Sequence, residues 1–163
     1  MSTAAVLAQY MSIESQLSYV ELQCTLWNNK ATAMSSKLSK MEKSEDKWES
    51  ASDTAEEAYD DPSKELKIKG EVFKTKVESA GGACGRQRPY ISLNRQEFAE
   101  SYANRKVPDF DADLLEEYTD LDMEFSTMAA MYDTLKEELQ AQKDGLKETV
   151  SSEASDTHML NGG

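Results

Sequence analysis

Apolar residues recur along the first third of the chain at alternating steps of three and four. With Tyr10 at position a and Val6 at position d of a seven-residue repeat, 14 of the 16 seam positions up to residue 59 are apolar. A sustained repeat of this kind is typical of a coiled coil. The pattern predicts one helix from about Ala4 to Tyr59, which ends before Asp60-Asp61-Pro62 because proline lacks the amide donor that a helix needs.

A second repeat of the same kind lies near the other end of the chain. Between Leu114 and Thr149, 9 of 11 seam positions are apolar. Pro108-Asp109 is a typical start signal, and the acidic residues that follow favour the positive end of a helix dipole. We therefore expect a helix from about Asp111 to Val150, followed by a flexible tail over residues 151–163.

The two repeats predict an all-α fold, an elongated antiparallel coiled-coil hairpin with a small inserted subdomain. Four segments follow: a heptad helix over residues 1–60, a basic insertion with short helices and a glycine-rich loop over 61–109, an acidic heptad helix over 110–150, and the tail. The side chains that we expect in the hairpin seam are Ile13, Leu17, Val20, Trp27, Leu38, Trp48, Leu121, Phe125, Tyr132 and Leu139.

The insertion contains two further predictable segments. Residues 64–79 fit either a helix or a small β-hairpin whose turn includes Gly70, and we favour the helix. Asn94 and Glu97 have the spacing of a capping box for a short helix to about Arg105 that carries Phe98.

A second apolar group lies on the first predicted helix, outside the seam. Its members are Leu7, Met11, Tyr19, Leu22 and Leu26. Within residues 1–29 the only charged side chains are Glu14 and Glu21. A helix with so little charge is expected to contact protein on more than one side. The alternatives are that the insertion covers this face or that other subunits do, and we favour other subunits.

Charge and composition narrow the possible functions. The 163 residues carry 31 acidic and 18 basic side chains, a net charge of −13. This balance argues against a nucleic-acid partner. No apolar run is long enough to span a membrane, and the first residues lack the basic start and apolar core of a secretory signal. By segment, residues 64–108 are basic and residues 109–163 are strongly acidic.

Candidate chemical sites are few. Cys24 occupies a seam position and is interpreted as a small core residue, and Cys84, near Arg86 and Arg88, has no histidine to act as its base. The one histidine, His158, is in the predicted tail. Asp109-Phe110-Asp111-Ala112-Asp113 resembles the start of a calcium loop but lacks the glycine at position 6. We therefore predict no enzyme activity, no metal and no cofactor, and expect the basic side chains of the insertion to pair with acidic helix surface.

In its layout the chain resembles bacterial filament subunits: a charge-poor first helix and a second heptad helix flank a central insertion. Flagellin and the needle and filament proteins of type III secretion are similar in this respect. The resemblance implies a subunit that is exported without a cleaved signal and whose terminal helices form a helical tube.

These observations predict a non-catalytic, self-assembling coiled-coil subunit of a filament or similar repetitive assembly, whose partners are copies of itself. The alternative is a helical adaptor or chaperone-like holder that grips a protein client through the same apolar face. A filament subunit would be extracellular or on the cell surface, whereas an adaptor would be cytoplasmic.

Overall fold

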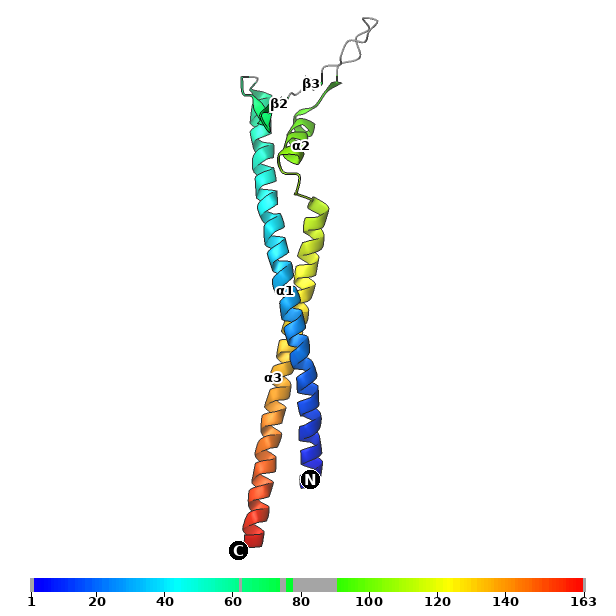
Figure 1. The fold of residues 1–163 in the computed structure, drawn as a ribbon, viewed down its shortest axis with the longest axis vertical. Coiled ribbons are helices and arrows are strands. Elements are labelled where there is room, and N and C mark those ends of the chain that lie inside the picture. The colour runs from blue at the N-terminus through cyan, green and yellow to red at the C-terminus, as the bar shows by residue number, and fades with distance from the viewer. Residues whose placement is uncertain (1, 62, 74–75, 78–90, 163) are drawn as a thin grey trace, which may run out of the picture. The chain divides into compact units, whose positions relative to one another are not determined.

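The computed structural model describes residues 2–61, 63–73, 76–77 and 91–162. In these ranges the chain is mostly helical, with α1 (Thr3–Asp60), α2 (Arg95–Lys106) and α3 (Ala112–Gly162) (Figure 1). Two short strand pairs complete the described elements: β1 (Leu66–Ile68) with β2 (Glu71–Phe73), and β3 (Lys76–Val77) with β4 (Ile91–Ser92). The all-α prediction is confirmed in this coarse form.

Contacts between Cα atoms divide the chain into two compact units. The terminal unit consists of Met1–Ser36 and Tyr118–Gly163, and the middle unit consists of Lys37–Glu117. α1 contributes its first part to the terminal unit and its last part to the middle unit.

Side chains cap the starts of both long helices. The hydroxyl of Ser2 accepts a hydrogen bond from the amide of Ala5 at 3.2 Å, at the start of α1. At the start of α3, the carboxylate of Asp111 accepts hydrogen bonds from the amides of Asp113 at 3.0 Å and Leu114 at 3.1 Å. These bonds satisfy donors that have no partner within the helix.

α3 is longer than the sequence predicts. The helix continues to Gly162, whereas the expected end was Val150 and a loose tail was expected beyond it. Residues 151–161 contain neither proline nor glycine, and serine and threonine are only mildly unfavourable inside a helix. Nothing in this stretch therefore stops the helix, and the predicted boundary was wrong.

In the terminal unit, α1 and α3 lie side by side and run in opposite directions (Figure 1). The carboxylate of Glu14 lies 3.6 Å from the ammonium of Lys143, and further along α1 the ring of Trp27 lies 5.7 Å from the ring of Phe125. The buried core between the helices consists of Leu17, Val20, Cys24 and Leu139, with Ile13 and Tyr132 packed against it. These residues hold the two helices together by apolar burial.

In the middle unit, the last part of α1 packs against α2 through small side chains. Ala51 and Ala55 of α1 are buried together with Ala99 and Ala103 of α2. The small alanine side chains let the two helices approach closely. They also occupy little volume, so the large ring of Phe98 fits into the same core, where it is only 1% exposed. Ala51 lies one position before the predicted a/d stripe, so the buried face of α1 has turned slightly by this point.

Aromatic rings fill the remainder of the middle core. Phe73 of β2 contacts Phe98 at 5.2 Å and Tyr102 at 5.6 Å between ring centres, and Tyr59 of α1 contacts Phe98 at 5.6 Å. Separations of this size are favourable for tilted and edge-on rings. The insertion thus has a core of its own with the end of α1.

Trp48 differs from its predicted role in a seam between the two heptad helices. Its ring lies 5.6 Å from that of Phe110, and its indole N–H donates a hydrogen bond to the side chain of Asn104 at 2.8 Å. Both partners precede α3, so Trp48 packs against the end of the insertion. Leu38 is half-buried within the same unit.

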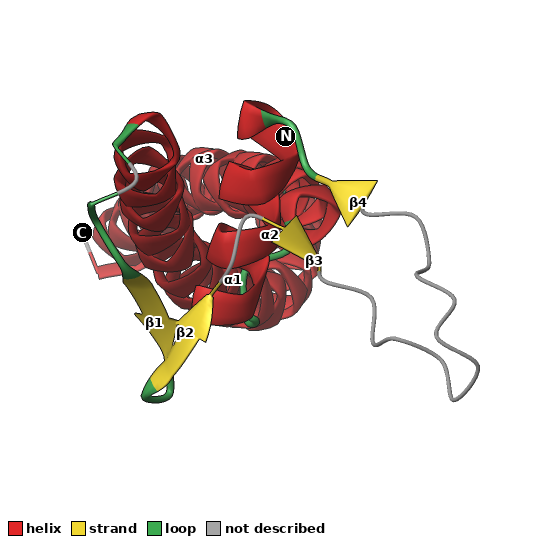
Figure 2. Cartoon of the chain, turned by 90° about the horizontal axis from the view of Figure 1, so that it is seen from above, coloured by secondary structure: helices red, strands yellow, loops and turns green. Residues whose placement is uncertain are grey.

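Residues 66–73 form a β-hairpin, so the prediction of a helix over 64–79 was wrong. β1 and β2 pair antiparallel with Leu66 opposite Phe73 (Figure 2). The two residues between the strands, Lys69 and Gly70, have φ angles of 52° and 84°. Two consecutive positive φ angles define the tight turn whose twist matches that of paired strands, and glycine adopts this conformation without steric cost.

The predicted cap of α2 is confirmed. The side chain of Asn94 accepts a hydrogen bond from the backbone amide of Glu97 at 2.8 Å. In turn, the carboxylate of Glu97 accepts a hydrogen bond from the backbone amide of Asn94 at 3.5 Å. The remaining residues of the predicted helix to Arg105 are helical as well.

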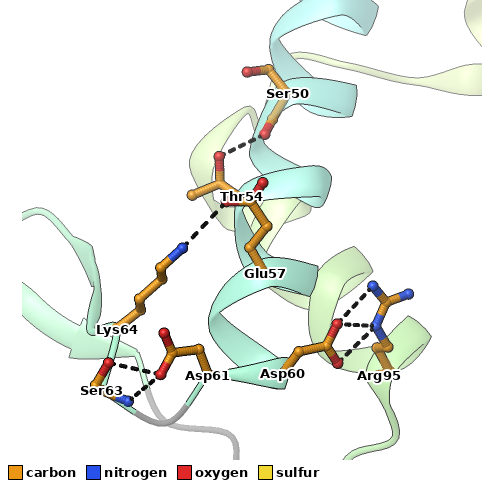
Figure 3. A network of polar contacts seen from close by, with 8 residues as sticks. All are labelled: Ser50, Thr54, Glu57, Asp60, Asp61, Ser63, Lys64 and Arg95. Carbon is orange, nitrogen blue, oxygen red and sulfur yellow. Dashed lines mark hydrogen bonds and ion pairs between the residues drawn. The ribbon is translucent and has the colours of Figure 1, made fainter.

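Ion pairs neutralise the acidic end of α1 (Figure 3). Acidic side chains are unfavourable at the negative end of a helix dipole. Arg95 binds the carboxylate of Asp60 at 3.0 Å and that of Glu56 at 3.3 Å, and Lys64 lies 3.7 Å from Glu57. The hydrogen bond to Asp60 raises the pKa of Arg95. The expected pairing of basic insertion residues with acidic helix surface is confirmed for Arg95.

Two glycine substitutions test the hairpin assignment. Gly70→Ala forces a methyl group onto a residue at φ 84° and should cost about 1–2 kcal/mol of stability. Gly145→Ala, inside α3, should add about 0.5–1 kcal/mol because alanine is the better helix former. Neither new methyl group meets another atom within 4 Å, so the two changes differ only in backbone conformation. Urea unfolding followed by circular dichroism measures the free energy of unfolding of both variants. If both changes shift it in the same direction, the assignment of a turn at Gly70 is contradicted.

Candidate assembly surface

One face of α1 in the terminal unit is covered by α3 and the opposite face is open. Every seam position of α1 from Val6 to Met34 is buried or half-buried. The five apolar residues predicted outside the seam are all exposed: Leu7 46%, Met11 61%, Tyr19 59%, Leu22 65% and Leu26 42%. At 3.6 residues per turn these five residues gather on the side of α1 away from the seam. We call this side the outer face of α1.

The outer face carries no charge. The two charged residues between Ala4 and Asn29, Glu14 and Glu21, both occupy the position that follows seam residue d and borders α3. Glu14 pairs with Lys143 of α3. One heptad further along the pair of helices, Glu21 of α1 and Lys136 of α3 occupy the same heptad positions as Glu14 and Lys143. The charges of this segment therefore border the seam, where they favour one register of the two helices. The outer face is left to apolar and small polar side chains.

Leu7 lies at the border of the outer face. It lines a shallow hollow together with Tyr10, Lys147, Val150 and Ser151. The hollow opens where the start of α1 meets the later part of α3. Leu7 therefore contacts α3 with one side and presents the other side to solvent.

Sequence reasoning missed the exposed apolar residues of α3. Met123 is 68% exposed and Met131 is 48% exposed. Leu135, which occupies a seam position of the second repeat because it lies two heptads after Leu121, is 36% exposed, whereas Lys143 and Val150 beyond it are half-buried. A straight helix drifts by about 20° per seven residues against a strict heptad, so its buried stripe moves off the predicted positions. The sequence signal for them was the presence of methionine at non-seam positions of this helix, which applies to Met123 and Met131.

Cys24 is a buried seam residue, as predicted. Burial raises the pKa of its thiol, and the carboxylate of Asp133 raises it further by a hydrogen bond and by its charge, while Lys136 opposes the shift. The side-chain amide nitrogen of Asn28 donates hydrogen bonds to the backbone carbonyl of Cys24 at 2.8 Å and to the carboxylate of Asp133 at 3.3 Å. The neutral thiol is the favoured form, which is the opposite of an activated nucleophile.

Asp111 caps α3 with its carboxylate, as expected for the acidic residues that follow the start signal Pro108-Asp109. Over the ranges that the structure describes, no group of three or more metal-binding side chains is found. Cys84, Arg86 and Arg88 lie outside the described residues, and so does the side chain of His158.

Across the described helices, none is both long and apolar enough to cross a membrane. Comparisons of the chain with protein-family models, with curated proteins and with solved structures gave no match.

The raised pKa of Cys24 predicts a loss of stability at high pH. In the folded protein the thiol ionises above its usual pKa of 9.0, so the folded state holds this proton more tightly than the unfolded state. The contribution is complete below this value and is lost as the pH rises through the folded pKa. Between about pH 8 and pH 10, the free energy of unfolding should fall more for the wild-type chain than for Cys24→Ala. Urea unfolding at a series of pH values measures this difference. If the free energy of unfolding depends on pH in the same way for both proteins, the burial of a neutral thiol is contradicted.

Proposed function

We propose that this chain is a non-catalytic structural subunit that assembles with copies of itself through the outer face of α1. In this proposal α1 and α3 form an antiparallel coiled-coil hairpin, and the hairpins associate into a filament or similar repetitive assembly. The observation that carries the proposal is the uncharged outer face on a helix whose opposite side is already packed. A helix with apolar residues on two sides is expected to be covered on two sides.

The energetics favour coverage by protein. Burying a leucine completely stabilises a structure by about 1.5–3 kcal/mol, whereas exposed ion pairs contribute about 0–1 kcal/mol. Leu22 and Met11 are each more than half exposed, so most of this stabilisation is still available to a partner. Contiguous exposed apolar patches on a protein surface mark sites of association.

The layout of the chain adds support of a weaker kind. The charge-poor first helix, the central insertion and the second heptad helix resemble those of bacterial filament subunits. On that resemblance we propose that the subunit acts outside the cell or at the cell surface.

A second candidate is a helical holder that binds a protein client. The exposed methionines Met11, Met123 and Met131 favour it, because flexible thioether side chains adapt to partners of different shape. Such a holder would be a monomer or small oligomer without its client. The size of the purified particle therefore separates the two candidates.

The double change Leu22→Lys and Leu26→Lys should block assembly and leave helicity nearly unchanged. Both side chains are exposed in the single chain, where such substitutions cost within about 0.5 kcal/mol, but burying the new charges between subunits would cost several kcal/mol. Size-exclusion chromatography with light scattering measures the particle mass, and circular dichroism measures the helicity.

The matched control is Ala141→Lys with Thr149→Lys. Both residues are exposed on α3, and the pair adds the same two charges to the terminal unit. This variant should keep the particle mass of the wild-type chain. If the Leu22 and Leu26 variant also keeps it, the outer face of α1 is not the interface.

A further inference from the structure

A row of residues that crosses the outer face obliquely, starting from its border at Leu7, follows a spacing that is the same in both directions. Reading along α1, the steps between them are four, four, three, four and four. They are Leu7, Met11, Ser15, Ser18, Leu22 and Leu26. Large side chains stand at both ends of this row and two serines stand in the middle. All six are exposed in the single chain.

The row is symmetric in side-chain size as well as in spacing. Leu7 corresponds to Leu26, and Met11 corresponds to Leu22, about a midpoint between the two serines. The residue numbers of each corresponding pair add up to 33. An antiparallel copy of the same helix, centred on this midpoint, would therefore present a matching row.

We infer that the outer face of α1 binds the outer face of α1 in a second copy of this chain, antiparallel, with a two-fold axis at the level between Gln16 and Leu17. This inference rests on the proposed function, since it names the partner and geometry of the same face. Such a contact is self-complementary: each residue that one copy contributes is also contributed by the other.

The axial positions fit close packing of two helices. Met11 of one copy comes level with Leu22 of the other, and Ser15 comes level with Ser18. The small serines at the centre allow the two helix axes to approach, as small residues do at the contact points of packed helices. Leu7 of one copy and Leu26 of the other then lie level with each other at opposite edges of the contact, where they exclude water from it.

The distribution of charged side chains favours α1 of the second copy over α3 as the partner of the outer face. The outer face has no charged residue between Ala4 and Asn29, so pairing it with itself removes no charge from water. The exposed surface of α3 includes Glu137, Glu138 and Glu148, and an uncharged partner could not compensate the loss of their hydration. The dipoles of two antiparallel helices also attract each other, whereas those of parallel helices repel.

Disulfide trapping tests the inference. In a background with Cys24→Ala and Cys84→Ser, one protein carries Met11→Cys and a second, tagged to differ in size, carries Leu22→Cys. The antiparallel pair brings these two positions level, within the Cα separation of about 4.4–6.8 Å that a disulfide needs. Position 11 of one copy is then offset along the helix axis from position 11 of the other copy by eleven residues, about 16 Å. Oxidation should therefore cross-link the mixture and leave each single variant uncross-linked.

A matched control checks the register. Met11→Cys mixed with Asn29→Cys places both cysteines on the same face but about 10 Å apart along the axis, so it should not cross-link. Strong cross-linking of Met11→Cys with itself would show a parallel arrangement and overturn the inference.

Sedimentation of the cysteine-free background separates failure of the inference from failure of the proposed function. If the background is an oligomer and the Met11 and Leu22 mixture gives no cross-link, the copies associate through another surface and only the antiparallel pairing is wrong. If both the background and the wild-type chain sediment as single chains of 18.2 kDa, self-assembly and the pairing are both wrong. An oligomer that cross-links only in the mixture supports both.

Discussion

The burial of one stripe along α1 is the constraint on which the described structure depends. A helix of 58 residues gains little from intrinsic propensity alone, and most of its stability must come from packing. In the terminal unit that stripe lies against α3, with Leu17, Val20 and Cys24 at its centre. In the middle unit it lies against α2 and the β1–β2 hairpin, where Ala55 is fully buried. One continuous helix thus takes part in two separate cores, and the composition of each core follows from its partner.

The same constraint explains why the outer face matters. Once α3 covers the seam, a single copy has no described element to cover Met11, Tyr19 and Leu22, which remain more than half exposed. The charges of this segment stand at the border of the seam, as the ion pair between Glu14 and Lys143 illustrates. In our proposal the seam stabilises the subunit and the outer face joins subunits.

The sequence predicted the periodic helices and the cap of α2 well, and it predicted the β1–β2 hairpin and the end of α3 poorly. The heptads identified α1 and the exposed residues of its outer face, because side-chain periodicity depends only on helix geometry. The β1–β2 hairpin was missed since Lys69-Gly70 is a weaker turn signal than Asn-Gly, and five apolar residues in sixteen fit a helix equally well. The end of α3 was placed too early because serine-rich composition was interpreted as loose chain. Trp48 was assigned the wrong partner because a heptad shows that a position is buried but does not identify the element that buries it.

The most direct test of the central claim is the mass of the full chain in solution. Analytical ultracentrifugation over a hundredfold range of concentration, at physiological salt, gives this mass without any substitution. The account predicts species heavier than the single chain of 18.2 kDa, with a two-chain particle as the smallest building block. A single species of 18.2 kDa at every concentration would show that the outer face of α1 does not bind a second copy and would contradict the account.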